Sequence, residues 1–385
     1  LKPQIGESGS LGPSAYIPYF YVISDTNDLT FKPRIFTDKL SLHTEYRKVT
    51  KKAQHIFDVS LTAGHDSSND DKGDTRSHFF SNSMIDLDMS FFDVSSLDIQ
   101  LQKTSNNTYL KVFQLESPLF GDNRISSNVS SLSSFVYLKA NKEDLNFSAS
   151  IRANENLEAP NSDRYEFIFP NYSLNKNINT NDTLDGNLSF SSSGSYHLYN
   201  TNIKEALIQN NLKYDSQDIF FSNGIKNNYQ VLLRNVNTDG ENSSAYKSEL
   251  QSELLSAAIF ETSYPLLREG INFDGYLSPK LSLRYSPNHM KNLRDNSVRI
   301  GINNIFGMDR IGVSNTVESG QSLTFGIDYK LHRNSYYAET RLEEDEDLPV
   351  LPTEFLELIL ASVLRDEINE NIPISCSIGN KSSDV

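Results

Sequence analysis

Alternation of apolar and polar residues is the feature that most constrains the fold of this 385-residue chain. In residues 85–91 the odd positions are apolar, whereas Asp86, Asp88 and Ser90 occupy the even positions. Successive side chains of a β-strand point to opposite faces, so this period of two predicts strands with one apolar and one polar face. The pattern recurs at residues 97–101, 145–151, 298–302 and 323–331. The sequence therefore predicts an all-β protein.

The spacing of the predicted strands favours a large antiparallel sheet. Long connectors rich in Asn, Asp, Ser and Gly alternate with short ones, and this alternation of loop lengths is typical of outer-membrane barrels. With about ten residues per strand and a connector after each, the chain would hold roughly 14–18 strands. Alternation alone leaves two architectures open. The apolar face packs on a dry core in a water-soluble protein and meets lipid in a membrane barrel.

Composition narrows the possible partners. The net charge of −15 and the pI near 4.9 argue against a nucleic-acid partner, which requires basic patches. The mean hydropathy is −0.47 and no run of eighteen apolar residues occurs, so no membrane-spanning helix is predicted. A transmembrane barrel has a polar average too, because its lumen-facing residues are polar. Cys376 is the only cysteine, so no disulfide can form within the chain.

Two prolines interrupt the first predicted strand pair. Residues 17–24 and 29–37 are rich in aromatic and β-branched residues and are separated by a polar turn, which predicts a hairpin. Pro18 and Pro33 lie inside its two arms. Proline has no N–H for a ladder, so both belong to an edge or to a weakly bonded seam. They either deter edge-to-edge aggregation or allow the strand pair to separate.

The same residues carry a family resemblance. The segments, in chain order, are Ile17-Pro-Tyr-Phe-Tyr21 with Asn27-Asp-Leu-Thr-Phe-x-Pro-Arg34, then Glu45-Tyr-Arg47, Thr108-Tyr-Leu110, Leu277-Ser-Pro-Lys-Leu-x-Leu-Arg-Tyr285, Asn303-Asn-Ile-Phe-Gly-Met-Asp-Arg-Ile311 and Arg365-Asp-Glu-Ile-Asn369. Their order over residues 1–385 resembles the barrel of the LPS-assembly protein LptD family, also called OstA or Imp.

The resemblance implies a fold and a domain organisation. Residues 1–16 would be the linker from a periplasmic jelly roll, and residues 17–385 would be an incomplete transmembrane β-barrel of the outer membrane of a Gram-negative bacterium. The jelly roll and the C-terminal part of the barrel would lie outside this chain. An incomplete barrel has open strand edges that lipid cannot satisfy.

The resemblance also implies a function without covalent chemistry. Lipopolysaccharide (LPS) would enter the outer leaflet through a lateral gate flanked by Pro18 and Pro33, while its sugar stays in a lumen lined by Asp86, Asp88 and Asp98. The implied partners are LPS, an LptE-like plug lipoprotein, a periplasmic bridge protein bound through the jelly roll, and outer-membrane lipid. No enzyme activity and no cofactor are implied.

One segment departs from the family pattern. Residues 339–364 read as an acidic loop followed by an amphipathic helix that Thr353 would cap. The apolar positions at helical spacing are Phe355, Leu356, Ile359, Leu360, Val363 and Leu364. The sequence predicts an atypical acidic and helical insertion here.

Catalytic and metal motifs are lacking. The seven histidines form no HExxH motif or i, i+4 pair, so no metal site is predicted. Residues 66–74 are similar to a calcium loop, but Asp71 replaces the required glycine. Two other functions remain open. A secreted all-β adhesin or polysaccharide-binding protein would have a dry core, and a general porin or receptor barrel would contain a constriction loop or plug domain.

Overall fold

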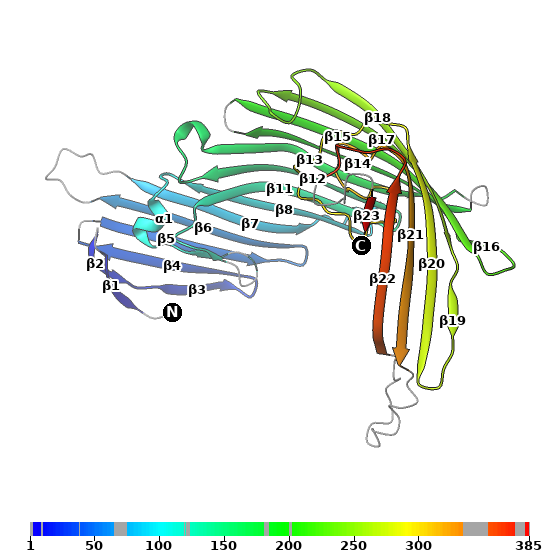
Figure 1. Cartoon of the computed structure of the whole chain (residues 1–385). Coiled ribbons are helices and arrows are strands. Elements are labelled where there is room, and N and C mark those ends of the chain that lie inside the picture. The colour runs from blue at the N-terminus through cyan, green and yellow to red at the C-terminus, as the bar shows by residue number, and fades with distance from the viewer. Residues whose placement is uncertain are drawn as a thin grey trace. The chain divides into compact units, whose positions relative to one another are not determined.

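The computed structural model describes residues 3–8, 11–37, 39–64, 75–118, 120, 124–180, 185–199, 202–333, 353–373 and 382–384. The predicted antiparallel all-β fold is confirmed, because one sheet contains 21 strands and β9 and β10 form a separate pair (Figure 1). In these ranges no pairing joins the first strands of the chain to the last, so the sheet is not closed into a barrel. Nor is any helix in them long and apolar enough to cross a membrane.

The first half of the chain contains strands β1 to β13, one α-helix and one 3₁₀-helix. Their bounds are β1 Gln4–Ser8, β2 Gly12–Tyr16, β3 Tyr19–Ser24, β4 Asn27–Phe36, β5 Lys39–Val49, β6 Ala53–Gly64, β7 Arg76–Asp86, β8 Val94–Thr104, α1 Tyr109–Phe113, β9 Ser117–Pro118, β10 Arg124–Ile125, β11 Ser131–Lys142, β12 Leu145–Asn156, η1 Asn161–Asp163 and β13 Tyr165–Ile178.

The second half contains strands β14 to β23. Their bounds are β14 Gly186–Tyr199, β15 Ile203–Ser216, β16 Ile219–Phe220, β17 Lys226–Glu241, β18 Gln251–Ser263, β19 Leu266–Arg268, β20 Phe273–Ser286, β21 Gly320–Arg333, β22 Thr353–Arg365 and β23 Ser382–Asp384. The 21 strands of the large sheet exceed the predicted 14–18, because several of them are short; fifteen of the strands described have ten or more residues.

The chain divides into two compact units. Unit 1 contains residues 1–175, 193–208 and 238–251, and unit 2 contains residues 176–192, 209–237 and 252–385. Neighbouring strands of unit 1 pair in chain order from β4 to β8, and β8 then pairs with β11. In unit 2, β18, β20, β21 and β22 pair in the same way.

The burial pattern of the strands is the reverse of that in a water-soluble sheet. In β5 of unit 1, Leu40 and Leu42 are exposed, whereas Ser41 and His43 are buried. Strand β20 of unit 2 has the same pattern, with Leu281, Leu283 and Tyr285 exposed and Ser282, Arg284 and Ser286 buried. A half-buried antiparallel sheet in water normally buries its apolar face. Here the polar face is the covered one.

In each unit a long hairpin connector folds back over the polar face. The first cover, residues 105–130, joins β8 to β11, which pair directly with each other. The second cover, residues 287–319, joins β20 to β21, which also pair directly. Each cover contributes apolar side chains to a small core, such as Phe113 and Leu115 in unit 1 and Ile305 and Ile311 in unit 2.

Three predicted elements differ from the structure. Residues 1–16, expected to be a linker, contain β1 and β2, which pair with each other, and β2 also pairs with β4. Residues 298–302, expected to be a strand, belong to the second cover and have no strand structure. The segment has no neighbouring strand with which it could pair. The buried side chain of Ile300 packs in the core of unit 2 instead.

The predicted helix that begins at Thr353 is wrong. Residues 353–365 form β22, which pairs with β21 along its length, apart from a register shift between Leu331 and His332. Ladder bonds to β21 and the burial of Val363 under the second cover outweigh the local helical spacing. The acidic part of the predicted insertion, residues 339–352, lies outside the described residues.

Close packing of the second cover on β21 requires a glycine. A Cβ atom at Gly326 would lie 2.8 Å from the carbonyl oxygen of Leu360 and 2.9 Å from Cζ of Phe306. We expect Gly326→Ala to lower the free energy of unfolding by about 1–3 kcal/mol, because overpacking forces strand β22 and the ring apart. Denaturant titration followed by tyrosine fluorescence measures the change.

Gly301→Ala is the matched control. Gly301 lies in the same cover, and a Cβ atom there would meet nothing within 4 Å. Equal stabilities of the two variants would contradict the close approach at Gly326.

Candidate functional site

The register of unit 2 aligns three polar residues on neighbouring strands. Arg284 of β20 lies opposite Ser322 of β21, which lies opposite Arg365 of β22. All three side chains are on the covered face, and the two arginines are only 3% and 4% exposed. Buried guanidinium groups need counter-charges and hydrogen-bond acceptors. The second cover supplies both.

Glu318 of the second cover is the centre of this charged cluster. Its carboxylate accepts hydrogen bonds from Arg310 Nε at 2.9 Å and from Arg365 Nε at 2.8 Å. Arg284 Nη2 donates to its backbone oxygen at 2.8 Å. Arg310 also donates to Ser322 Oγ of β21 at 2.5 Å. Three arginines and one glutamate, all buried, therefore fasten the second cover to three strands.

A fourth arginine extends this attachment. Arg234 of β17 forms an ion pair with Asp309 at 2.8 Å between Nη2 and Oδ2. Its Nη1 donates to the backbone oxygens of Val313 at 3.1 Å and Thr316 at 3.2 Å. The second cover is thus held by charged side chains from β17, β20 and β22.

The charges of the cluster shift its ionisation. Burial opposes the ionisation of Glu318, but the charges of Arg310, Arg365 and Arg284 outweigh burial and lower the Glu318 pKa to about 2. Burial lowers the pKa of Arg310 to about 10, although Glu318 acts in the opposite direction. Both groups are charged at neutral pH.

In unit 1 the polar face carries a row of hydroxyl and imidazole groups. His43 of β5 lies opposite Ser60 of β6, which lies opposite His78 of β7. Asp58 is on the same face of β6, forms an ion pair with His43, and is 1% exposed. Tyr109 of α1 in the first cover packs on this row, with its hydroxyl oxygen 2.7 Å from Ser60 Oγ.

A polar cavity of about 460 Å³ adjoins this row in unit 1. Lys32, Arg34 and Arg124 contribute three positive charges to its lining, while Glu116 is a lining acid and Lys32 is paired with Glu45 at 2.8 Å. Arg34 Nη1 donates to the backbone oxygen of Phe113 at 3.0 Å, so the first cover holds this guanidinium group in place. The excess of cationic groups suits an anionic ligand better than a cationic one.

The two predicted gate prolines lie at the edge of unit 1. Pro18 separates β2 from β3, both of which pair with β4, and Pro33 lies within β4. The backbone N–H of Ile17 donates to the Pro33 oxygen at 3.2 Å. In an antiparallel ladder, the N–H and C=O of one residue point to the same neighbour. Pro33 therefore lacks a donor toward the β2–β3 edge, and Pro18 lacks one on the side away from β4.

The three predicted lumen residues occupy different environments. Asp98 of β8 is half-buried and lies opposite Met84 of β7, on the same side of the sheet as His78. Asp86 is exposed at the end of β7. Asp88 lies beyond that strand in a turn with a φ of 48° and forms a 2.6 Å ion pair with Lys52. The predicted strand ends before Asp88, because the chain turns there into β8.

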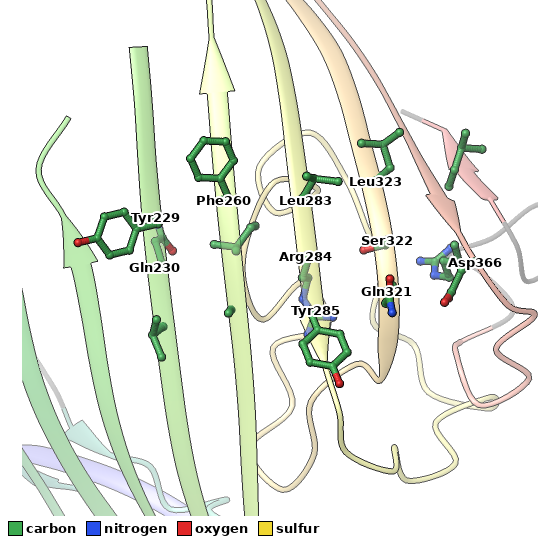
Figure 2. A pocket seen from close by; sticks show the side chains of 15 residues that line it. Tyr229, Gln230, Phe260, Leu283, Arg284, Tyr285, Gln321, Ser322, Leu323 and Asp366 are labelled. Atoms are coloured by element: carbon green, nitrogen blue, oxygen red, sulfur yellow. The ribbon is translucent and has the colours of Figure 1, made fainter. Parts of the chain in front are cut away.

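The opposite face of unit 2 is apolar and indented. Phe260, Leu283, Leu323 and Leu364 form one cross-strand row from β18 to β22. They line a depression of about 650 Å³, and Figure 2 shows the side chains of the first three on adjacent strands. The polar row that contains Arg284 is the next row in register. Neighbouring residues of one strand therefore lie on the exposed apolar face and on the buried charged face.

Sequence reasoning missed the charged cluster, although a signal was present. Arg284, Arg310 and Arg365 each lie in a different segment that carries the family resemblance. Those segments are far apart in the chain and meet only through the register of β20 to β22 and the fold of the second cover. Two predicted groups remain unplaced, because the calcium-like loop at 66–74 and Cys376 lie outside the described residues.

Comparison with known proteins gives no family. No model of a protein family matches the chain, and no curated protein sequence matches it. The LptD-family resemblance therefore stays a prediction.

The Glu318 cluster predicts a pH dependence. The Glu318 pKa is lower in the folded state than the ordinary glutamate value of 4.5, so its contribution to stability is complete above that value and is lost as the pH falls toward 2. We expect Glu318→Gln to cost about 3–5 kcal/mol at neutral pH, because three buried arginines lose their counter-ion. The difference between the two proteins should shrink on acidification, as denaturant titrations at several pH values would measure.

Glu253→Gln is the control for this measurement. Glu253 also joins the sheet to the second cover, through Lys291 at 3.6 Å, but its side chain is 42% exposed. An exposed ion pair contributes at most about 1 kcal/mol. A Glu318→Gln protein no less stable than the Glu253→Gln protein would show that the cluster does not fasten the cover.

Proposed function

We propose that this chain is the barrel part of an outer-membrane LPS-assembly translocon of the LptD type, located in a Gram-negative outer membrane. The observation that carries the proposal is the reversed burial of the strands, with apolar side chains exposed and polar side chains covered. A sheet of this kind suits lipid on one side and a hydrated passage on the other. No covalent chemistry is required of it.

The apolar face supports a lipid environment. Its exposed side chains are not isolated, since Phe260, Leu283, Leu323 and Leu364 form a continuous row across four strands. Single exposed apolar residues are normal on soluble proteins, whereas contiguous apolar surfaces mark contact with membranes or partners. Outer-membrane lipid is the partner we propose for this face.

The cavity of unit 1 supports an anionic amphiphile as the cargo. LPS carries phosphate groups beside its acyl chains, and Lys32, Arg34 and Arg124 line a cavity beside strands β1, β2 and β4. Charge-assisted hydrogen bonds from lysine and arginine suit phosphate oxygens. We propose that LPS headgroups pass this cavity, and that the implied plug lipoprotein and periplasmic bridge protein act with regions beyond it.

The edge of unit 1 supports a lateral gate. All six residues of β3 are exposed, and Pro18 and Pro33 withdraw donors from opposite sides of the edge strand. Each ladder hydrogen bond contributes about 1 kcal/mol net. Because the seam has fewer donors, fewer hydrogen bonds must break when the wall opens. Proline has no N–H, so opening leaves no unsatisfied donor of these two residues in hydrocarbon.

A charge on the apolar face distinguishes a membrane protein from a soluble adhesin. We expect Leu283→Arg to cost at least about 1 kcal/mol of folding stability in lipid bilayers, because arginine on a lipid-facing strand costs about 2–4 kcal/mol at the bilayer midplane and less toward the interfaces. A surface substitution on a water-soluble protein changes stability by only about 0.5 kcal/mol. Folding titrations in phospholipid vesicles measure the cost.

Ile271→Arg is the matched control, because Ile271 is 84% exposed but lies in the bend between β19 and β20. If Leu283→Arg and Ile271→Arg are equally tolerated, and the protein stays monodisperse without detergent, the membrane proposal fails in favour of the adhesin.

A strand-forming residue at position 18 tests the gate. We expect Pro18→Val in the full-length protein to restore one donor and to reduce gate opening about fivefold, the equivalent of one net hydrogen bond. Cells should then show less surface LPS and greater sensitivity to large antibiotics. Pro160→Val, in an exposed connector, is the control. Unchanged surface LPS in the Pro18→Val cells would reject the gate but not the membrane location.

A further inference from the structure

The His43–Asp58–His78 cluster of unit 1 has the composition of a metal site. The three groups come from adjacent strands β5, β6 and β7, and their ligand atoms lie within 4.8 Å of one another. His43 and His78 are 5% and 2% exposed, and Asp58 is 1% exposed. Two imidazoles and one carboxylate suit divalent transition metals, zinc in particular.

The hydrogen bonds around His78 determine which of its nitrogens holds a proton. A chain of four contacts links His78 Nδ1 to Ser60 Oγ at 2.5 Å, Ser60 to the Tyr109 hydroxyl at 2.7 Å, Tyr109 to Thr62 at 2.8 Å, and Thr62 to Ser41 at 2.9 Å. Thr62 donates to Ser41. Three contacts remain, and the Ser60 and Tyr109 hydroxyls supply only two protons. The third proton must come from His78 Nδ1.

With a proton on Nδ1, the Nε2 atom of a neutral His78 ring would present a lone pair. That atom lies 3.5 Å from Asp58 Oδ1, an oxygen that also carries lone pairs. Within the described residues, neither His78 Nε2 nor the second Asp58 oxygen has a hydrogen-bond partner, although both are buried. Two buried acceptors at this distance are stable only when a proton or a metal cation lies between them.

The surroundings meet two further requirements of a metal site. A histidine that binds a metal through one ring nitrogen normally donates a hydrogen bond from the other, as His78 Nδ1 does to Ser60 Oγ. Zinc bound at about 2.0–2.2 Å separates its ligand atoms by about 3.4 Å, close to the distance between His78 Nε2 and Asp58 Oδ1. His43 Nε2 instead contacts Asp58 Oδ1 directly, so metal binding requires a side-chain rotation that separates these two atoms. His43 also lines the polar cavity, so the cluster adjoins a hollow whose lysine and arginine side chains would slow the entry of a cation.

We propose that His43, Asp58 and His78 form a three-ligand site for Zn²⁺ or a similar divalent transition metal. The bound ion gives coordination partners to His78 Nε2 and Asp58, and it links β5, β6 and β7 beneath the first cover. This proposal is independent of the LPS-assembly function.

Metal titration of the purified full chain tests the proposal. After treatment with a chelator, we expect the protein to take up one equivalent of Zn²⁺ by calorimetry and to give a visible Co²⁺ spectrum. Asp58→Asn and His78→Gln should each weaken Zn²⁺ binding by at least about 100-fold, and Ser60→Ala by about 10–100-fold through the lost second hydrogen bond of His78. His55→Gln, on the same strand β6 and bonded to Ser83, should bind normally.

X-ray absorption of the unsubstituted protein loaded with Zn²⁺ covers the case in which a variant fails to fold. Two imidazoles with oxygen ligands are expected. A sulfur ligand would assign the metal to Cys376, and no saturable uptake by the folded protein would leave the cluster a hydrogen-bonded anchor. Either result, or equal affinity in His78→Gln and His55→Gln, overturns the proposal.

Discussion

The fold depends on keeping buried charge neutral on the polar face of the sheet. Arg284 and Arg365 are fixed on that face by the register of their strands, and neither can reach water. Glu318 neutralises them only when the second cover lies over the sheet. The cluster therefore fixes the position of the cover, and the cover in turn assigns the opposite face of the same strands to the exterior. One buried carboxylate thus joins the second cover to the charged part of the polar face of unit 2.

Unit 1 achieves the same reversal with weaker charges and more hydroxyl groups. Tyr109 inserts its ring between the sheet and the first cover and extends its hydroxyl into the row of Ser60 and Thr62. Arg34 bonds the end of α1. Buried polar networks of this type have a specific geometry, because few alternative arrangements satisfy their members. Among the described residues, His78 Nε2 and the second Asp58 oxygen are the members of this row that lack a hydrogen-bond partner. The covers are consequently part of the folded structure of each unit.

Alternation in the sequence was sufficient to predict strands, but not their neighbours. Residues 323–331 lie in a strand as predicted, because β20 and β22 pair with it on both sides. Residues 298–302 have the same pattern but form no strand, because no strand pairs with them. Residues 353–364 have helical spacing but form a strand, because β21 and β23 pair with it. A sequence pattern reports the preference of a segment, whereas pairing depends on residues far away in the chain.

The candidate sites were predictable to the same limited extent. Pro18 and Pro33 were visible because the absence of an N–H is a property of the residue itself. The His43, Asp58 and His78 cluster was not, because a search for histidines at helical spacing cannot detect ligands from three strands. Glu318 and the arginines around it were missed for the same reason, since their approach follows from the register alone.

Both covers are hairpin loops, and each is therefore tethered at its two ends to strands that pair with each other. A tethered segment that detaches can swing but cannot diffuse away, and its effective concentration near its binding face stays on the order of millimolar. Displacement of a cover is thereby a reversible motion that needs no recapture from solution. A plug supplied by a separate protein, once released, would have to find the sheet again by diffusion.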